Sequence, residues 1–158
     1  MPVMLAEAPR EVGIGIRPAL VRDLPRVMEI ERLAFGEQWD YYQFKASLED
    51  VFLLAVDAVT ADIVGFLVAC CCEIAQRGII LRVAVHPDFQ GRGIATELIE
   101  RSFGELKKKK LDEVELDVDI LKSGAIGLYE KVGFLVKEVF STSEENDDTF
   151  CIMRKKLG

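Results

Sequence analysis

The feature that most constrains the fold of this chain is a strand that leads through a glycine-rich turn into an amphipathic helix. The strand ends at Val85, and the turn contains Gly91 and Gly93. A helix is predicted over residues 93–109, because its apolar residues recur at helical spacing. The first amides of a helix have no partner within it and lie at the positive end of its dipole. The segment therefore predicts a site for a phosphate or pyrophosphate group, because glycine lets a ligand approach the backbone closely.

Two interpretations other than a phosphate site are possible for this turn. A dinucleotide fingerprint would need G-x-G-x-x-G in an early βαβ unit, with an acidic residue about 20 positions further on. Here Thr96 occupies the third glycine position and the turn comes late in the chain, which disfavours that reading. The other interpretation is an ordinary strand-to-helix turn that binds nothing.

The order of strands and helices predicts an α/β (α+β) fold. The expected strands are residues 14–17, 52–59, 63–74, 79–85, 113–120, 134–141 and 149–155, and the expected helices are residues 22–35, 41–48, 93–109 and 123–132. Strands joined as local hairpins and interrupted by helices favour a mixed, mostly antiparallel sheet with helices on its faces. We therefore expect about seven strands and about four helices.

The size and charge of the chain limit what it can be. Its 158 residues suit one domain, with residues 1–13 as a flexible arm and residues 14–158 as the folded part. A net charge of −7 disfavours nucleic acid as a partner and suits a cationic substrate. The apolar run of residues 63–72 is too short to cross a bilayer, and the N-terminus lacks the apolar segment of a signal peptide. We expect no membrane association and a cytoplasmic location.

The four cysteines do not have the spacing of a metal site or a redox motif. Cys70, Cys71 and Cys72 are consecutive, and Cys151 is far away in the sequence. They are interpreted as small buried hydrophobic residues on strands, in a reducing compartment. No metal is expected.

The glycine-rich turn resembles the acyl-CoA-binding motif of the GNAT superfamily of N-acetyltransferases. That motif is Q/R-x-x-G-x-G/A, and here it is Gln90-Gly91-Arg92-Gly93-Ile94-Ala95. The preceding V-A-V-H-P-D-F and the later L-Y-E-K-V-G-F, at residues 128–134, also resemble family motifs. The resemblance covers roughly residues 14–156. Residues 30–39, I-E-R-L-A-F-G-E-Q-W, together with Phe44, resemble the RimI-like branch, which with its archaeal relatives acetylates the α-amino groups of protein N-termini.

The resemblance implies a fold, a cofactor and the residues that bind it. It implies the GNAT fold, with the sheet splayed open beside the strand that ends at Val85, and transfer of an acetyl group from acetyl-CoA to an amine by direct attack. Lys122 stands where the family often has an asparagine that contacts the cofactor, so that contact is missing or replaced. The implied cofactor-binding residues are Val83, Ala84, Val85, Gln90, Gly91, Arg92, Gly93, Ile94, Ala95, Thr96 and Lys122.

The resemblance also implies catalytic positions, each with an alternative. Tyr129 matches the family's tyrosine acid, and the alternative is an aromatic residue packed in its helix. Asp117 matches the glutamate base of RimI-like enzymes but is one methylene shorter, and the alternative is a polar residue on a solvent-facing strand. Independently of the resemblance, Glu31 is the other candidate for the base, because a carboxylate on an apolar helical face needs a partner or a purpose. It either contacts the substrate amine or holds the following loop.

The acceptor substrate is the least constrained part of the prediction. Phe35, Trp39 and Tyr41 are expected to line its binding site, and packing in the core is the equal alternative for Trp39 and Tyr41. His86 is interpreted as part of a turn. Residues 141–148 form an acidic segment in place of the tyrosine pair of RimI-like enzymes, which favours a cationic substrate. Three hypotheses remain open: an acetyltransferase for protein N-termini, an acetyltransferase for small amines (polyamine, amino acid or aminoglycoside), and a non-catalytic acetyl-CoA sensor. A homodimer through the last strands is a further expectation.

Overall fold

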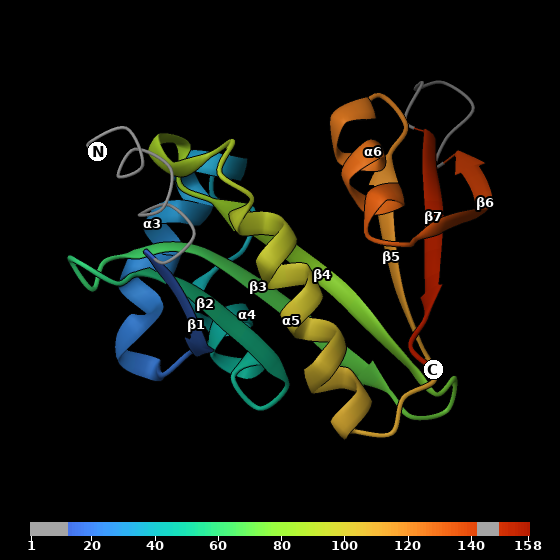
Figure 1. The fold of residues 1–158 in the computed structure, drawn as a ribbon, viewed down its shortest axis with the longest axis horizontal. Helices are drawn as coiled ribbons and strands as arrows, with labels where there is room; N and C mark the ends of the chain where they lie inside the picture. The colour runs from blue at the N-terminus through green and yellow to red at the C-terminus, as the bar shows by residue number, and fades with distance from the viewer. Residues whose placement is uncertain (1–12, 142–148) are drawn as a thin grey trace, which may run out of the picture. The chain divides into compact units, whose positions relative to one another are not determined.

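The computed structural model describes residues 13–141 and 149–158 (Figure 1). Its strands are β1 (Ile14–Pro18), β2 (Val51–Asp57), β3 (Ile63–Cys72), β4 (Arg77–Val85), β5 (Glu113–Asp119), β6 (Leu135–Ser141) and β7 (Thr149–Lys156). Its α-helices are α3 (Leu24–Phe35), α4 (Tyr41–Ser47), α5 (Ile94–Lys108) and α6 (Ser123–Lys131), and its 3₁₀ turns are η1 (Val21–Asp23) and η2 (Pro87–Phe89). Strands and α-helices follow the predicted order, and the two 3₁₀ turns are additional. The predicted arm, apart from Gly13, and the acidic segment after Ser141 lie outside the described residues.

The seven strands form one sheet in the order β1-β2-β3-β4-β5-β7-β6. Strand β4 pairs with β5 in parallel, whereas β1–β2, β2–β3, β5–β7 and β6–β7 are antiparallel. These strands and the four α-helices of the described residues confirm the predicted mixed, mostly antiparallel fold. The ladder between β4 and β5 joins residues 77–79 to residues 113–115 and ends there, before either strand ends.

The described residues divide into two compact units. Unit 1 contains the residues up to Ala69 and Arg82–Ser102, and unit 2 contains Cys70–Leu81 and Phe103–Gly158. Strands β3 and β4 and helix α5 therefore each contribute residues to both units. Among the helices of the described residues, none has the length and apolar character needed to cross a membrane.

In unit 1, helices lie on both faces of strands β2 and β3. Phe44 of α4 packs edge to face on Phe66 of β3, with ring centroids 5.5 Å apart. Because side chains alternate along a strand, Gly65 faces the other way, and a Cβ there would lie 3.5 Å from Ile94 and Leu98 of α5. The nearest atom to that Cβ would be the Ala84 carbonyl oxygen of β4, at 3.0 Å, so glycine avoids a tight contact with β4 while α5 packs on this face at ordinary contact distance. This packing positions the start of α5 and the turn before it.

In unit 2, strand β5 has the two faces that its alternating sequence predicts. Val114, Leu116 and Val118 are buried, whereas Asp117 between them is exposed. Phe134, just after α6, is fully buried. The apolar face of β5 therefore contributes to the core of this unit, and its polar face carries Asp117.

The first α-helix begins later than the sequence predicts, at Leu24 instead of residue 22. The carboxylate of Asp23 accepts hydrogen bonds from the backbone N–H of Leu20 at 2.8 Å and from both Nη atoms of Arg17. These bonds hold the 3₁₀ turn η1 before the helix, and the hydrogen bonds from Arg17, with a smaller contribution from its charge, lower the pKa of Asp23. Asp23 thus stabilises the entry to α3 through the preceding turn and makes no side-chain cap to the helix itself.

Two predictions about burial are wrong. Cys70, Cys71 and Cys72 are half-buried, because burial along β3 falls at its last three residues, whereas Cys151 is buried as expected. The alternation of apolar and charged residues over 113–120 predicts that Ile120 continues the apolar face of β5, but Ile120 is 42% exposed, because the strand ends at Asp119.

Candidate active site

The turn between β4 and α5 has the backbone that a phosphate site requires. Gly91 and Gly93 both have a φ of 78°, in the left-handed region that favours glycine. A Cβ at either position would meet no atom within 4 Å, so the turn is open on that side. The bond from the Glu97 N–H to the Gly93 carbonyl, at 3.1 Å, is the first of the helix. The amides of residues 94–96 precede it and have no partner within the helix.

Two side chains complete this turn. Gln90 donates from Nε2 to the Val85 carbonyl at 3.3 Å and so ties the turn to the end of β4. The Arg92 guanidinium lies 4.9 Å from the centroid of the Phe89 ring and is exposed. A cavity of about 280 Å³ is lined by Phe89, Arg92 and residues of the β1 and β2 ends, including Asp57, so it is distinct from the amides of residues 94–96. The open amides, the helix dipole and this cation together fit a pyrophosphate group.

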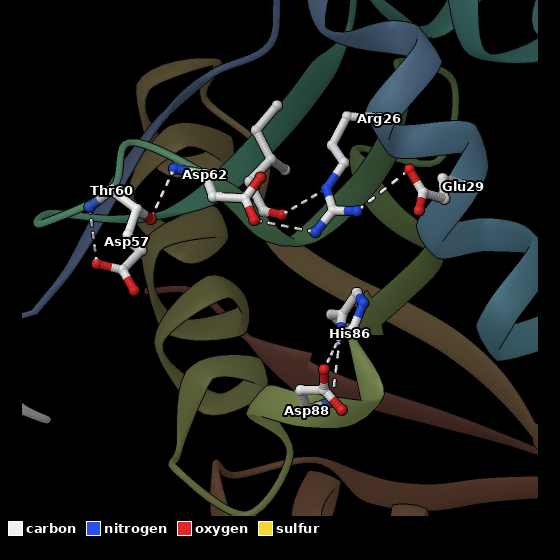
Figure 2. Close-up of polar contacts among 8 residues, drawn as sticks. Arg26, Glu29, Asp57, Thr60, Asp62, His86 and Asp88 are labelled. Carbon is white, nitrogen blue, oxygen red and sulfur yellow. Dashed lines mark hydrogen bonds and ion pairs between the residues drawn. The ribbon is translucent and has the colours of Figure 1, made fainter.

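His86 belongs to the turn, in agreement with its interpretation from sequence. Its Nδ1 accepts a hydrogen bond from the backbone N–H of Asp88 at 3.1 Å, and its backbone N–H donates to the Val64 carbonyl at 2.8 Å. Figure 2 shows its ring directed towards Asp88. The histidine thus caps η2 and helps fix the path of the chain into the glycine turn.

Glu31 is part of an ion pair that the sequence did not identify. Only 1% of its side chain is exposed, and Arg82 of β4 donates from Nε to Oε1 at 2.9 Å and from Nη2 to Oε2 at 2.8 Å. The backbone N–H of Trp39 donates to the same carboxylate at 3.1 Å. Of the two alternatives for Glu31, this geometry is that of a residue that holds the loop after α3.

Aromatic residues of the predicted acceptor site surround Arg82. Its guanidinium carbon lies 4.4 Å from the centroid of the Phe35 ring and 5.3 Å from that of Trp39. Tyr41 instead contacts the ring of Tyr42, with centroids 5.5 Å apart. The structure therefore brings Glu31, Phe35 and Trp39 together around Arg82, and Tyr41 makes different contacts.

Tyr129 and Asp117 interact in unit 2. The Tyr129 ring packs edge to face on Phe134, with centroids 5.9 Å apart. Burial, and to a smaller degree the charge of Asp117, raise the pKa of Tyr129. The side chain therefore keeps its proton throughout the neutral range. Lys122 is exposed at the N-cap of α6, where its carbonyl accepts from Ile126 at 3.1 Å.

Comparison with known proteins identifies the family. Residues 21–134 match the acetyltransferase (GNAT) family. The chain belongs to the GNAT family. It is 30% identical over 148 residues to an N-alpha-acetyltransferase of Sulfurisphaera tokodaii, covering 85% of this chain and 86% of the relative. It is 28% identical to the [ribosomal protein bS18]-alanine N-acetyltransferase of Salmonella typhimurium, covering 80% of this chain and 86% of the relative.

A solved structure agrees with the GNAT fold. The NatC complex bound to Gag peptide and CoA contains a chain that superposes with a TM-score of 0.80 at 22% identity, covering 92% of this chain and 99% of that one. The family match and the named relatives make this chain an N-acetyltransferase that transfers an acetyl group to an amine. The third hypothesis from sequence, a non-catalytic sensor, is therefore set aside.

The partner of Glu31 in this GNAT protein was not identified from the sequence. Arg82 is 51 positions from Glu31, so no local pattern connects them. Two signals could have indicated the pair. Glu31 is a carboxylate on an apolar helical face, and Arg82 is a charged residue within the apolar strand I-I-L-R-V-A-V. Each needs a partner when buried, and each is the obvious partner of the other.

Proposed function

We propose that this chain transfers the acetyl group of acetyl-CoA to the α-amino group of a protein N-terminus. The observation that carries the proposal is the open turn of residues 91–96 at the start of α5, which fits a pyrophosphate. The relative from Sulfurisphaera tokodaii and the bS18-alanine N-acetyltransferase support the acceptor class, because both names refer to N-terminal or alanine acetylation. The NatC structure, with its peptide and CoA, is consistent with it.

The cofactor is proposed to bind along β4 and at the start of α5. When bound, acetyl-CoA supplies an activated acetyl thioester. The amides of residues 91–96 hold its pyrophosphate, and Arg92 adds a positive charge beside them. Val83 and Val85 offer backbone groups to the pantetheine arm, and Gln90 keeps the end of that strand in place through its bond to the Val85 carbonyl.

Two side chains of unit 2 are proposed to move protons. An α-amino group has a pKa of about 7.7–8.0, so much of it carries an extra proton at neutral pH. Asp117 is exposed and takes this proton through a bridging water, which compensates for its short side chain. The neutral amine then attacks the thioester carbonyl, and the C–N bond forms as the C–S bond breaks. Tyr129, whose raised pKa keeps its hydroxyl protonated, donates its proton to the departing sulfur, and the second proton lost by the nitrogen restores the Tyr129 hydroxyl through water.

The test is acetyl-CoA turnover measured by free-thiol release. Short peptides with free N-termini are compared with polyamines and amino acids, for the wild type and Tyr129→Phe. We expect turnover on peptides, and a kcat at least about 10²-fold lower in the variant, as loss of a general acid predicts. The same peptides with blocked N-termini are the matched control and should be inactive. Turnover confined to polyamines or amino acids would overturn the proposal.

A small-amine acceptor is the second candidate. A cavity of about 520 Å³ beside α3 has Glu29, Glu37 and Asp40 in its lining, together with Trp39 and one cation, Arg32, so its charged residues are mostly acidic. Carboxylates beside an aromatic ring suit a small cation. The polyamine arm of the same panel tests this candidate, because it predicts turnover there that Asp40→Asn and Glu37→Gln reduce.

A further inference from the structure

The loop between α3 and α4 is held differently at its ends and in its middle. It begins with Gly36 and Glu37, which both have positive φ, 71° and 64°. A glutamate rarely adopts that conformation, so the surrounding structure must stabilise it. The loop ends at Asp40, whose carboxylate accepts from the Gln43 N–H at 2.9 Å while Gln43 Oε1 accepts from the Asp40 N–H at 2.9 Å.

Polar contacts to the middle of this loop come from one ion pair. Glu31 accepts from the backbone N–H of Trp39, and Arg82 donates from Nη2 to Gln38 Oε1 at 3.1 Å. The guanidinium also lies against the Trp39 ring, as described above. Arg82 thus contacts both the loop and the carboxylate that binds the loop.

Arg82 is also a residue of β4, the proposed cofactor strand. It immediately precedes Val83, the first residue of β4 to which pantetheine contacts are assigned. Its guanidinium is 12% exposed, forms two parallel bonds to Glu31 and stacks on Phe35, so its position is strongly constrained. One side chain therefore links the backbone of the cofactor strand to the loop that carries Trp39.

We propose that Arg82 is a positioning residue for the acceptor, which it serves by fixing residues 37–39, and that Glu31 anchors this loop and is not the general base. This inference rests on the proposed function for its kinetic readout. A base must reach the proton that it removes. Both oxygens of Glu31 already accept bonds from Arg82 or Trp39, and the side chain is almost fully buried.

The only tryptophan of the chain, Trp39, reports directly on this loop. The primary variant is Arg82→Lys, which keeps a positive charge beside Glu31 but loses the planar fork and its stacking. Arg82→Met removes the charge as well, and Glu31→Gln keeps an acceptor for the Trp39 amide. The matched control is Arg26→Gln. Arg26 pairs with Glu29 and Asp62, which are not residues of this loop (Figure 2).

Two measurements are made on each variant. Acrylamide quenching of Trp39 fluorescence is expected to increase in Arg82→Lys, and more in Arg82→Met, but not in Arg26→Gln. In the thiol-release assay, Arg82→Lys is expected to raise the KM of an acceptor peptide about tenfold while the KM of acetyl-CoA changes less than about twofold, because the lost interaction concerns acceptor binding. Glu31→Gln is expected to keep the pH dependence of kcat.

The outcomes separate this inference from the proposed function. Unchanged Trp39 quenching in Arg82→Lys, or an equal increase in both KM values, would overturn the role of Arg82. Loss of kcat together with the acidic limb of its pH profile in Glu31→Gln would make Glu31 the base and also overturn the inference. A wild type that acetylates no peptide refutes the proposed function alone, because the comparison of quenching between Arg82→Lys and Arg26→Gln still decides the loop anchor.

Discussion

At the scale of single residues, the protonation of Tyr129 is set by its neighbours in unit 2. Burial and the charge of Asp117 both disfavour the phenolate, so the pKa of Tyr129 lies above its ordinary value of about 10. The same pair of side chains carries the proposed acid and base. Their electrostatic interaction therefore keeps the acid protonated while Asp117 is charged.

This raised pKa predicts a pH dependence of stability. Below about pH 10 the folded and the unfolded chain both hold the Tyr129 proton, so its contribution to stability is complete. As the pH rises further, the unfolded chain loses the proton first, and this contribution is lost as the pH passes through the folded pKa. Tyr129→Phe should flatten the alkaline decline, measured by denaturant unfolding at a series of pH values. An equally steep decline in the variant would contradict the assignment.

Residue identity predicts some of this site and not the rest. The glycines of the turn could be predicted because no other residue readily adopts their φ, and Glu31 because a carboxylate on an apolar face needs a partner. The sequence does not predict that Arg82 is the partner of Glu31, because the two residues meet only when α3 packs on the sheet. The alternation of β5 likewise predicts that Asp117 is exposed, but not that it interacts with Tyr129.

At the scale of elements, the position at which α5 starts depends on one packing contact and on the backbone of the preceding turn. Ile94 is buried beside Gly65 of β3, and Gly91 and Gly93 turn the chain in the left-handed region. The helix thus begins at a defined place, directly after the open turn. Any change that moves this start should affect cofactor binding before it affects the core.

Gly93→Ala tests the turn, with Gly104→Ala as its matched control in the same helix. At a φ of 78°, alanine costs about 1–2 kcal/mol, and we expect acetyl-CoA affinity to fall about tenfold or more. Gly104 lies within α5, where a Cβ would meet no atom within 4 Å, so alanine there should stabilise the protein by about 0.5–1 kcal/mol. Isothermal titration calorimetry with CoA measures the change in affinity, and thermal unfolding measures the change in stability. Equal CoA affinity in Gly93→Ala and the wild type would refute the phosphate site.

At the scale of the whole molecule, the two units share three continuous elements. Strands β3 and β4 and helix α5 each pass from one unit into the other. Unfolding one unit must therefore break hydrogen bonds of an element that continues into the other. We expect the chain to unfold cooperatively for this reason.

Two core substitutions test this cooperativity. Phe66→Leu in unit 1 and Phe134→Leu in unit 2 each remove part of a fully buried ring and should cost about 1–3 kcal/mol. Trp39 lies in unit 1, so its fluorescence follows that unit directly. Cooperative unfolding requires that Phe134→Leu shift the Trp39 transition as far as the transition followed by circular dichroism. A Trp39 transition that Phe134→Leu leaves unmoved would show independent units.

The sequence predicts most of the strands and helices, but only part of the order in which the strands pair in the sheet. The period of two in β5 and the helical spacing in α5 predict both elements from local sequence. The position of β7 between β5 and β6 depends on non-local pairing, such as that of Leu116 with Met153, which no local pattern encodes. The sequence did not predict the turn η1, because Asp23 accepts hydrogen bonds from Arg17 instead of capping the helix.

Because β3, β4 and α5 each continue from one unit into the other, a chain divided between β3 and β4 gives two fragments that depend on each other. A break in the turn between β3 and β4 would give two polypeptides, each with segments of both units and a complete core of neither. Neither piece should fold alone, whereas the two expressed together could restore the sheet by pairing β3 with β4. The protein is thus suited to fragment complementation, with acetyltransferase activity as the signal that two fused partners have met.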